Sequence, residues 1–334
     1  MVEDSTLTVA VTGPTGDIGR ALIPALEASP SVARIIGMAR RPFDPESRGW
    51  HKTRYVQGDV LDRRRVNELV RGADVVVHLA FLIFGDRAVT HDVNLRGSEN
   101  VFRASVQAGV RRLVYTSSVA AYGFAPDRPA TLTEDVPAAG TREFYYSAHK
   151  AELEALLWKV VEGSATDAYV FRPCIVGGSD APAVIDDLAR VFRIGDRTPA
   201  GRLLMHLPGM HPALPDPGVP FQLVHQDDVA LALRAAVEGR GRPGVYNLAS
   251  DDTVTMHDLS RELGWYSLPT PPLVVELAGR AMPHMPGLPP DLDWLHALRV
   301  PSIMDTSKAT QELGWRPRFT GIEALRATLG REAR

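Results

Sequence analysis

Six short, almost continuously apolar runs alternate with helix-like stretches through the first half of the chain, and this alternation restricts the fold most. Runs that are apolar at successive positions are typical of parallel strands buried on both faces of a sheet. Repeated β-α-β order with short links therefore predicts an α/β fold, a doubly wound parallel sheet. The strand-like runs are residues 7–11, 34–39, 54–57, 75–79, 113–116 and 168–172, and the helix-like stretches are 18–28, 63–70, 89–107 and 147–162.

The turn after the first strand-like run reads TGPTGDIG over residues 12–19. Gly13 permits the tight turn, Gly16 lets the backbone approach a pyrophosphate, and Gly19 lets the helix pack closely on the sheet. The N-terminus of the following helix offers N–H groups and a partial positive charge to phosphates. Because the turn stands between a strand and a helix, it predicts dinucleotide binding rather than a plain turn.

Length and composition exclude several classes of protein. A chain of 334 residues suggests roughly two domains, and 45% hydrophobic with 23% charged residues excludes a disordered chain, a collagen-like fibre and a coiled coil. The net charge of −3 gives no general attraction for nucleic acid or for an anionic membrane. The single cysteine, Cys174, excludes an intrachain disulfide and a thiolate metal cluster.

The start of the chain, MVEDST, lacks the basic and apolar regions of a signal peptide. No apolar stretch approaches the roughly 20 residues that span a bilayer. We therefore expect a cytoplasmic enzyme whose partner is a small-molecule substrate, with no nucleic-acid and no membrane partner.

Composition shifts after about Gly177, and half of the 26 prolines lie in two windows, 199–220 and 269–290. Proline fixes φ and removes a hydrogen-bond donor, so these windows are loop-rich. We expect residues 1–177 to form a dinucleotide-binding Rossmann domain to which about 221–250 return. Residues 178–334 would then be mainly a smaller substrate-binding lobe, although ordinary surface connections would also explain the prolines.

Further motifs recur along nearly the whole chain. The glycine spacing is GxxGxxG, followed by GDV at 58–60, VVHLA at 76–80, NLRGS at 94–98, RP at 172–173, VHQDDVA at 224–230, SK at 307–308 and LGW at 313–315. This set resembles the extended branch of the short-chain dehydrogenase/reductase superfamily, the NAD-dependent epimerase/dehydratase-like family. The resemblance is specific for fold and cofactor class and uninformative about substrate. Phe81 stands where the family has a second alanine.

The resemblance implies a nicotinamide dinucleotide cofactor, with Asp59 on the adenine amino group and Lys150 on the nicotinamide ribose. Asn94 is expected to be a structural or cofactor-shell residue. The expected cofactor-binding residues are Gly13, Thr15, Gly16, Asp17, Ile18, Gly19, Arg40, Arg41, Asp59, Val60, Leu79, Ala80, Phe81, Asn94, Thr116, Tyr146, Lys150 and Pro173.

Tyr146 and Lys150 stand four residues apart in YSAHK, and such residues share one helix face. An ammonium beside a phenol favours the phenolate and should lower the pKa of Tyr146 into a usable range. The alternative is that Tyr146 and Lys150 are an ordinary pair on a helix surface. The glycine-rich turn earlier in the chain disfavours this alternative. The resemblance assigns proton exchange to Tyr146 and places Ser118 as the third catalytic residue, hydrogen-bonded to the reacting oxygen. Ser118 alone would read as a turn serine.

Two departures from the family bear on the reaction. Sugar-nucleotide dehydratases carry Thr-Asp-Glu where this chain has Ser118-Val119-Ala120, so the carboxylates for dehydration are missing. Epimerases show RxxNVYGP where this chain has RPCIVGG at 172–178, which is closer to reductases and hydroxysteroid dehydrogenases. The apolar residues 81–84 follow a strand at the ligand-binding edge of the sheet. They suit an apolar substrate or ordinary core packing.

The second strand ends without a carboxylate for the ribose hydroxyls of NAD, and Arg40 and Arg41 stand there instead. Two guanidiniums favour the 2′-phosphate of NADP, with NAD left open. The histidines, among them His206, His211, His284 and His296, show no metal-ligand spacing, so no metal is expected.

Three functions follow as hypotheses. The first is an NADP(H)-preferring oxidoreductase that interconverts a carbonyl and an alcohol on a small, moderately apolar molecule. The second is a sugar-nucleotide epimerase with tightly retained NAD, and the third is a non-catalytic NADP-binding redox sensor. The resemblance also implies a homodimer through helices 89–107 and 147–162. Its apolar surface would be Leu153, Leu156, Leu157 and Val160, unless these residues face the sheet.

Overall fold

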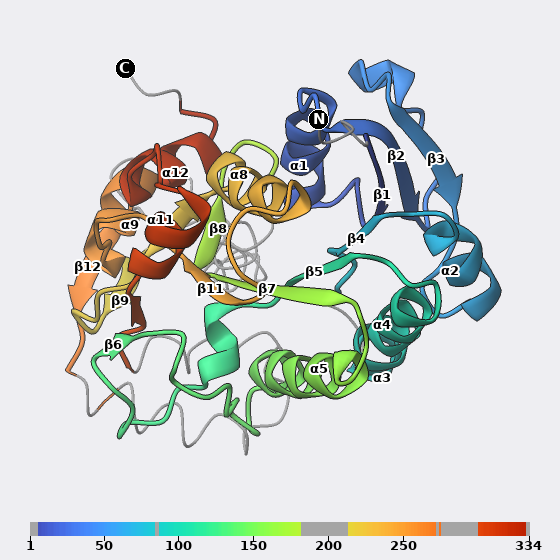
Figure 1. Cartoon of the computed structure of the whole chain (residues 1–334). Coiled ribbons are helices and arrows are strands. Elements are labelled where there is room, and N and C mark those ends of the chain that lie inside the picture. The colour runs from blue at the N-terminus through green and yellow to red at the C-terminus, as the bar shows by residue number, and fades with distance from the viewer. Residues whose placement is uncertain (1–5, 84–86, 182–212, 272–273, 275–299, 332–334) are drawn as a thin grey trace.

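The computed structural model describes residues 6–83, 87–181, 213–271, 274 and 300–331. A parallel sheet of seven strands in the order β11-β7-β5-β4-β1-β2-β3 forms its centre (Figure 1). The strands β2 and β3 are added on one side of β1, and β4 and the later strands are added in parallel on the other side. This order confirms the predicted doubly wound sheet. The strands are β1 (Leu7–Thr12), β2 (Val32–Ala39), β3 (Thr53–Gln57), β4 (Val75–His78), β5 (Arg112–Thr116), β7 (Asp167–Pro173) and β11 (Gly244–Leu248).

Helices cover both faces of this sheet. One face carries α1 (Asp17–Glu27), α8 (Gln226–Val237) and α11 (Ser307–Leu313), and the other carries α2 (Arg63–Val70), α4 (Ser98–Gln107) and α5 (Tyr145–Val161) (Figure 1). Alternate residues of a strand point to opposite faces. Val9 and Val11 of β1 therefore join one core, whereas Ala10 joins the other.

The segment expected as one helix over 89–107 contains a wider turn. It consists of α3 (Arg87–His91), a π-helical turn η2 (Asp92–Gly97) and α4. Asn94 is fully buried in the π-helical turn, where its side chain accepts from Leu82 N at 2.8 Å and donates to Leu82 O at 2.9 Å. The Asn94 amide thereby fixes the loop that follows β4, which is a structural use of this residue.

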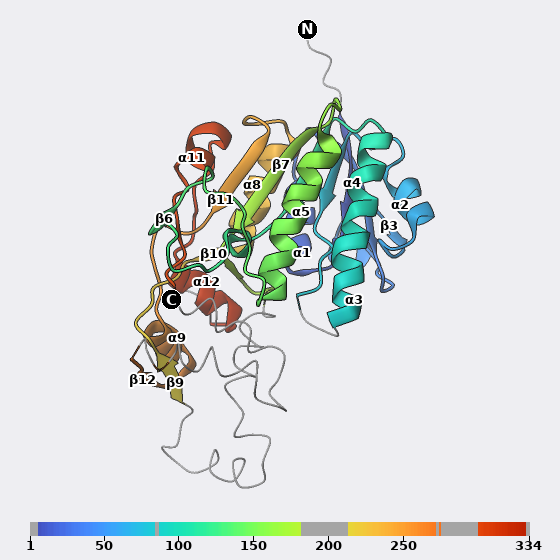
Figure 2. The same cartoon turned by 90° about the horizontal axis from the view of Figure 1, so that it is seen from below.

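The rest of the chain builds small elements beside the sheet. Three two-stranded parallel pairs are β8 (Ile175–Gly177) with β10 (Leu223–His225), β9 (Ala213–Asp216) with β12 (Tyr266–Pro269), and β6 (Thr131–Leu132) with β13 (Ile303–Met304). Figure 2 shows α9 (Met256–Leu263), β9 and β12 gathered to one side of the sheet, with α12 (Gly321–Thr328) nearby. Their separate apolar core is formed by Leu214, Leu223, Val254, Met256, Leu259, Ala324 and Leu325.

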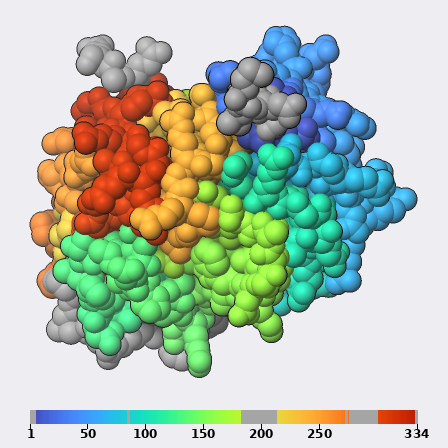
Figure 3. All heavy atoms as spheres, viewed as in Figure 1, coloured from blue at the N-terminus to red at the C-terminus, as the bar shows by residue number. Residues whose placement is uncertain are grey.

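The C-terminal helices are attached to the nucleotide fold through α8. Figure 3 shows their atoms directly beside those of α8. Asp228 of α8 is fully buried and accepts hydrogen bonds from the backbone N–H groups of Arg318 and Phe319, at 2.9 and 3.2 Å. Trp315 Nε1 donates to the Asp228 carbonyl at 2.7 Å.

Several expectations fall outside the described residues. They concern Phe84, most of both proline-rich windows, and His206, His211, His284 and His296. Across the ranges given above, no helix is both long and apolar enough to cross a membrane.

Candidate active site

The glycine-rich turn is tightly packed on one side and open on the other. Gly13 has φ of +74°, and a Cβ there would lie 3.0 Å from the Ala80 nitrogen. A Cβ on Gly19 would lie 2.3 Å from the Gly13 carbonyl oxygen. Gly16, by contrast, is exposed, and a Cβ on it would make only ordinary contact, 3.5 Å from the Gly13 oxygen. The space beside Gly16 is therefore free for a ligand.

Gly16 is also the N-cap of α1, and no side chain caps this helix end. The N–H groups of the first turn and the positive end of the helix dipole thus face the open side of the turn. Anionic groups bind well at such a helix end. The residues present therefore fit the pyrophosphate of a dinucleotide.

Charged side chains surround this turn. Burial raises the pKa of Asp17, and the nearby Asp180 raises it further. Arg20 opposes both, and its Nε donates to Thr15 O at 3.0 Å while its guanidinium pairs with Asp180 at 3.4 Å. Ile18 instead packs against the apolar core behind α1.

Arg40 and Arg41 follow β2 and are both exposed. Their backbone is fixed from β3, because Gln57 Nε2 donates to Arg40 O at 2.9 Å and the Tyr55 hydroxyl donates to Arg41 O. Within the described ranges, neither guanidinium has an ion-pair partner. The loop is thus held by its backbone, which leaves two cationic groups at the end of β2.

The expected adenine-binding segment follows β3. Asp59 Oδ1 accepts from Leu61 N at 2.9 Å, which shapes the turn. Val60 is buried, and its carbonyl accepts from Asn100 Nδ2 at 3.0 Å. Asp59 is half-buried at the same sheet edge as the glycine turn.

A buried histidine links the first strand to the residues after β4. His78 Nδ1 lies 2.7 Å from Thr12 Oγ1, and its Nε2 lies 2.8 Å from Ser98 Oγ. Thr12 Oγ1 in turn accepts from Ala80 N at 3.3 Å. Burial lowers the pKa of His78 to about 3, so the imidazole is neutral. These hydrogen bonds fix the backbone of Leu79 and Ala80 beside Gly13.

The structure brings Ser118, Tyr146 and Lys150 together at the end of β5. Ser118 is the N-cap of the short helix η3 (Val119–Tyr122), Tyr146 lies in the first turn of α5, and all three are buried. The Ser118 side chain is hydrogen-bonded to Tyr146. Lys150 Nζ donates to Thr116 O at 2.9 Å and lies 3.8 Å from the centre of the Phe81 ring. The same ring packs edge-on against Tyr146, with the ring centres 5.5 Å apart.

The expectation that Lys150 lowers the pKa of Tyr146 is wrong. Burial raises the pKa of Tyr146 to about 12, and the hydrogen bond with Ser118 only partly opposes this. Burial also lowers the pKa of Lys150 to about 7. Lys150 is directed to Thr116 O, and its Nζ lies 5.8 Å from the Tyr146 ring centre. Desolvation therefore outweighs the attraction between the two groups.

Two further buried hydroxyls stand beside these residues. Thr116 Oγ1 and the Tyr115 hydroxyl, both on β5, have no hydrogen-bond partner in the described structure. Such orphaned groups at a strand end are what a bound ligand would satisfy. Pro173 ends the neighbouring strand β7, paired with Leu248, and so lies at the same edge. These observations also fit a cofactor along the carboxyl ends of the strands.

A buried polar network that sequence reasoning missed lies beneath the catalytic residues. Glu154 pairs with Arg172 at 2.6 Å and accepts from Ser117 Oγ. The Arg172 guanidinium lies 4.2 Å from the centre of the Tyr122 ring, and the Tyr122 hydroxyl donates to Asn247 Oδ1 at 2.7 Å. The only sequence signal was the position of Glu154, one helical turn after Lys150.

Aromatic side chains pack around Tyr146. Tyr145, which lies next to it, donates its hydroxyl to Ile83 O in the loop after β4. The apolar cluster consists of the buried Ala120, Phe124, Phe144 and Tyr146, with Phe81, Ile83 and Tyr145 partly buried against them. Within the described residues, no group of three or more His, Cys, Asp and Glu side chains is arranged to hold a metal ion.

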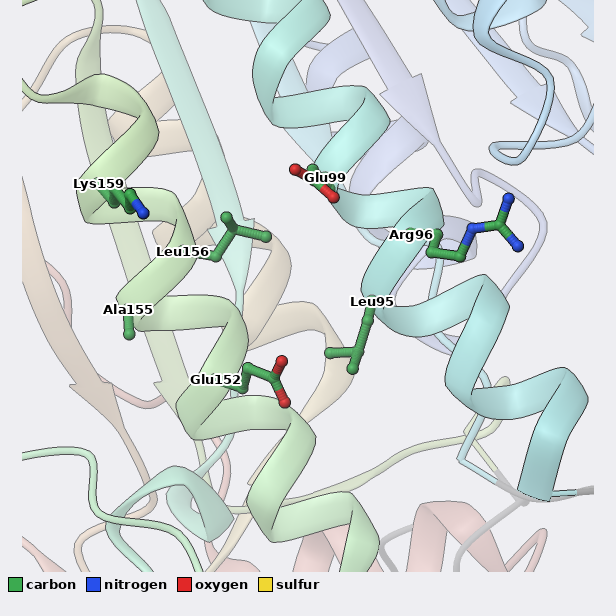
Figure 4. A pocket seen from close by; sticks show the side chains of 7 residues that line it. All are labelled: Leu95, Arg96, Glu99, Glu152, Ala155, Leu156 and Lys159. Carbon is green, nitrogen blue, oxygen red and sulfur yellow. The ribbon is translucent and has the colours of Figure 1, made fainter.

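The expected dimer surface is only partly available. Leu153 and Leu157 are fully buried against the sheet, so their assignment to a dimer surface is wrong. Leu156 and Val160 are half-buried. A groove of about 360 Å³ lies between α5 and the η2–α4 segment. Figure 4 shows the side chains that line it, Leu95, Arg96, Glu99, Glu152, Ala155, Leu156 and Lys159.

The fold, together with the buried Ser118, Tyr146 and Lys150, is typical of a class of dinucleotide-binding enzymes. Residues 9–249 match the family described as the NAD dependent epimerase/dehydratase family. The chain belongs to this family.

Individual relatives differ in their reactions. The chain is similar to 2-alkyl-3-oxoalkanoate reductase of Shewanella oneidensis, with 30% identity over 201 residues, 58% of this chain and half of that protein's length. A short-chain dehydrogenase/reductase superfamily protein of Agrobacterium tumefaciens, solved with bound NAD, superposes with a TM-score of 0.71 and 19% identity over 97% of each chain. UDP-glucose 4-epimerase of Thermotoga maritima also gives a TM-score of 0.71 at 19% identity, over 97% of this chain and 98% of that one. These two likenesses show the fold, a parallel α/β sheet of the dinucleotide-binding type.

Proposed function

We propose that this protein is an NADP(H)-preferring oxidoreductase that interconverts a carbonyl and an alcohol on a small, moderately apolar molecule. The observation that carries the proposal is the aromatic cluster around Tyr146. Phe81, Phe124 and Phe144 pack around the acid–base residue, and Phe81, which is only half-buried, is the ring that a ligand can reach. Apolar walls favour a substrate whose reacting carbon bears alkyl or aryl groups.

The residues beside Ser118 favour simple oxidation and reduction over elimination. Val119 and Ala120 are buried and carry no carboxylate, so they offer no acid or base for removing water from the substrate. The relative from Shewanella is named as the reductase of a ketone that bears an alkyl chain. Its name supports a carbonyl substrate of the same general kind.

Each catalytic residue has one role in this proposal. The nicotinamide cofactor, when bound, supplies or accepts the hydride. Tyr146 holds its proton at neutral pH and gives it to the carbonyl oxygen during reduction. Ser118, hydrogen-bonded to Tyr146, donates to the same oxygen, and Lys150 holds the cofactor's ribose. In oxidation the proton returns from the alcohol to Tyr146.

The test is reduction of a carbonyl panel by the full chain and by Tyr146→Phe. The panel contains alkyl 3-oxo acids, aryl ketones and aldehydes, each with NADPH and with NADH. We expect Tyr146→Phe to bind NADPH normally and to lose at least about a hundredfold in turnover, because general acid catalysis contributes that much. Tyr169→Phe is the matched control, since that hydroxyl donates to Gly241 O away from the site.

Three outcomes would overturn the proposal. The first is normal turnover in Tyr146→Phe, which would exclude its role as the acid. The second is a wild-type chain that reduces no carbonyl but interconverts sugar nucleotides on bound NAD, which would favour an epimerase. Binding of NADP without any turnover would instead favour a redox sensor.

A further inference from the structure

We propose that Glu154, held in place by Arg172 and Ser117, is a positioning residue that keeps the Lys150 side chain charged inside the buried site. The proposal rests on the proposed function only in giving Lys150 a catalytic use. Its test measures Lys150 itself and needs no substrate.

The two side chains are placed together by the helix and by one strand end. Lys150 and Glu154 stand one turn apart on α5, and both are almost fully buried, at 3% and 2% exposure. Lys150 Nζ donates to the carbonyl of Thr116, whereas Glu154 accepts from the hydroxyl of the next residue, Ser117. Successive turns of the helix thus contact successive residues at the end of β5.

Glu154 is fixed more firmly than an ordinary helix carboxylate. Arg172 of β7 donates to it through Nε, at 3.0 and 3.2 Å from the two carboxylate oxygens, and through a terminal nitrogen at 2.6 Å. A forked guanidinium contact of this kind holds a carboxylate in one orientation. The ionised carboxylate therefore stays buried one turn below Lys150.

Most groups near Lys150 are uncharged at neutral pH. Burial keeps His78 neutral, and burial raises the pKa of Tyr115 and of Tyr146, so both phenols hold their protons. The charged group that remains beside Lys150 is Glu154, which is itself paired with Arg172. The titratable and charged groups facing Lys150 are Tyr146 and Glu154 on α5, His78 on β4 and Tyr115 on β5.

Burial and Glu154 act on Lys150 in opposite directions. Burial lowers the pKa of Lys150 to about 7, and Glu154 is the group that raises it. Arg172 holds the Glu154 carboxylate ionised and in one orientation. Removing the carboxylate should therefore lower the pKa of Lys150 further, and removing the guanidinium should lower it to a smaller extent, because the carboxylate loses its partner.

The experiment follows the side chain of Lys150 by NMR in the full chain, freed of nucleotide. The sequence has four lysines, Lys52, Lys150, Lys159 and Lys308, so labelling lysine Cε with ¹³C gives few signals. We expect Glu154→Gln to lower the pKa of Lys150 by about one unit or more and Arg172→Met to lower it by a smaller amount. Glu154→Asp should restore part of the loss.

The matched control is Glu152→Gln, an exposed carboxylate on the same helix, which should leave the Lys150 titration unchanged. A merely structural ion pair would lower the melting temperature in both test variants without shifting the Lys150 titration. The proposal is overturned if Glu154→Gln raises the pKa of Lys150 or leaves its titration as in the control. If Glu154→Gln does not fold, the Arg172→Met arm decides, because a rise or no change there contradicts the proposal.

Discussion

At the scale of single residues, burial sets the protonation of the site. Burial raises the pKa of Tyr146 to about 12 and lowers the pKa of Lys150 to about 7. A protonated phenol next to Ser118 is suited to donating to a carbonyl oxygen, which is the reductive direction. The same burial that prepares the donor makes Lys150 sensitive to each charge near it.

His78 provides a pH prediction at this scale. An unfolded histidine takes up a proton near pH 6.5, whereas folded His78 does so near 3. Between these values the unfolded state binds more protons, so the free energy of unfolding falls as the pH is lowered from about 6.5 towards 3. His78→Gln should be less stable at pH 8 but should lose less stability on acidification.

Urea unfolding at pH 8 and at pH 4.5 checks this. Wild type and variant should show different losses between the two pH values. Equal losses would mean that His78 does not contribute to acid sensitivity.

At the scale of elements, two glycines of the turn before α1 have different roles. Gly19 allows the helix to pack, and Gly16 leaves space for a ligand. A Cβ on Gly19 would meet the Gly13 carbonyl at 2.3 Å, whereas one on Gly16 would meet nothing closer than 3.5 Å. Gly19→Ala should therefore destabilise the chain by about 2 kcal/mol or more through overpacking. Gly16→Val should fold normally and bind nucleotide at least about tenfold more weakly, because its side chain occupies the phosphate side of the turn.

Thermal unfolding and nucleotide titration of the two variants separate these effects. The reverse pattern, a stable Gly19→Ala chain and a Gly16→Val chain with full affinity, would contradict the assignment of the turn.

Elements with strong local patterns could be predicted from the sequence. The apolar runs of β1, β4 and β5 and the Tyr146–Lys150 spacing depend on neighbouring residues, so they were visible without a structure. The π-helical turn at 92–97 was not, because its cause is the contact of Asn94 with Leu82. Two-residue strands such as β6 and β13 carry no pattern of their own.

The network beneath the site was hidden for a related reason. Tyr122 and Asn247 meet although 125 residues separate them, and Arg172 lies 18 residues from Glu154. Contacts this distant in sequence leave no periodicity to recognise. The raised pKa of Tyr146 could not be predicted from the sequence either, because it depends on burial by Phe81, Phe144 and their neighbours.

At the scale of the whole molecule, we propose a homodimer in which a second copy covers the groove on α5. The groove carries Leu156 and Leu95 between two positive side chains, Arg96 and Lys159, and two negative ones, Glu99 and Glu152 (Figure 4). A surface with both signs of charge around an apolar strip is able to pair with itself across a two-fold axis. Trp158 on α5 adds exposed apolar area, at 37%.

Light scattering coupled to size exclusion tests this assembly. Wild type should have the mass of a dimer at micromolar concentration, and Leu156→Arg should have the mass of a monomer with unchanged fold by circular dichroism. A monomeric wild type would refute the dimer.

An oxidoreductase of the proposed kind binds NADP(H) and releases it again in each catalytic cycle. Mass spectrometry of nucleotide released from the purified, denatured protein, paired with NADPH and NADH titrations of wild type and Arg40→Ala, tests this exchange most directly. We predict little retained nucleotide, tighter binding of NADPH than of NADH, and loss of that preference in Arg40→Ala. Stoichiometric retained NAD, with no preference for NADPH, would contradict the account and favour an epimerase.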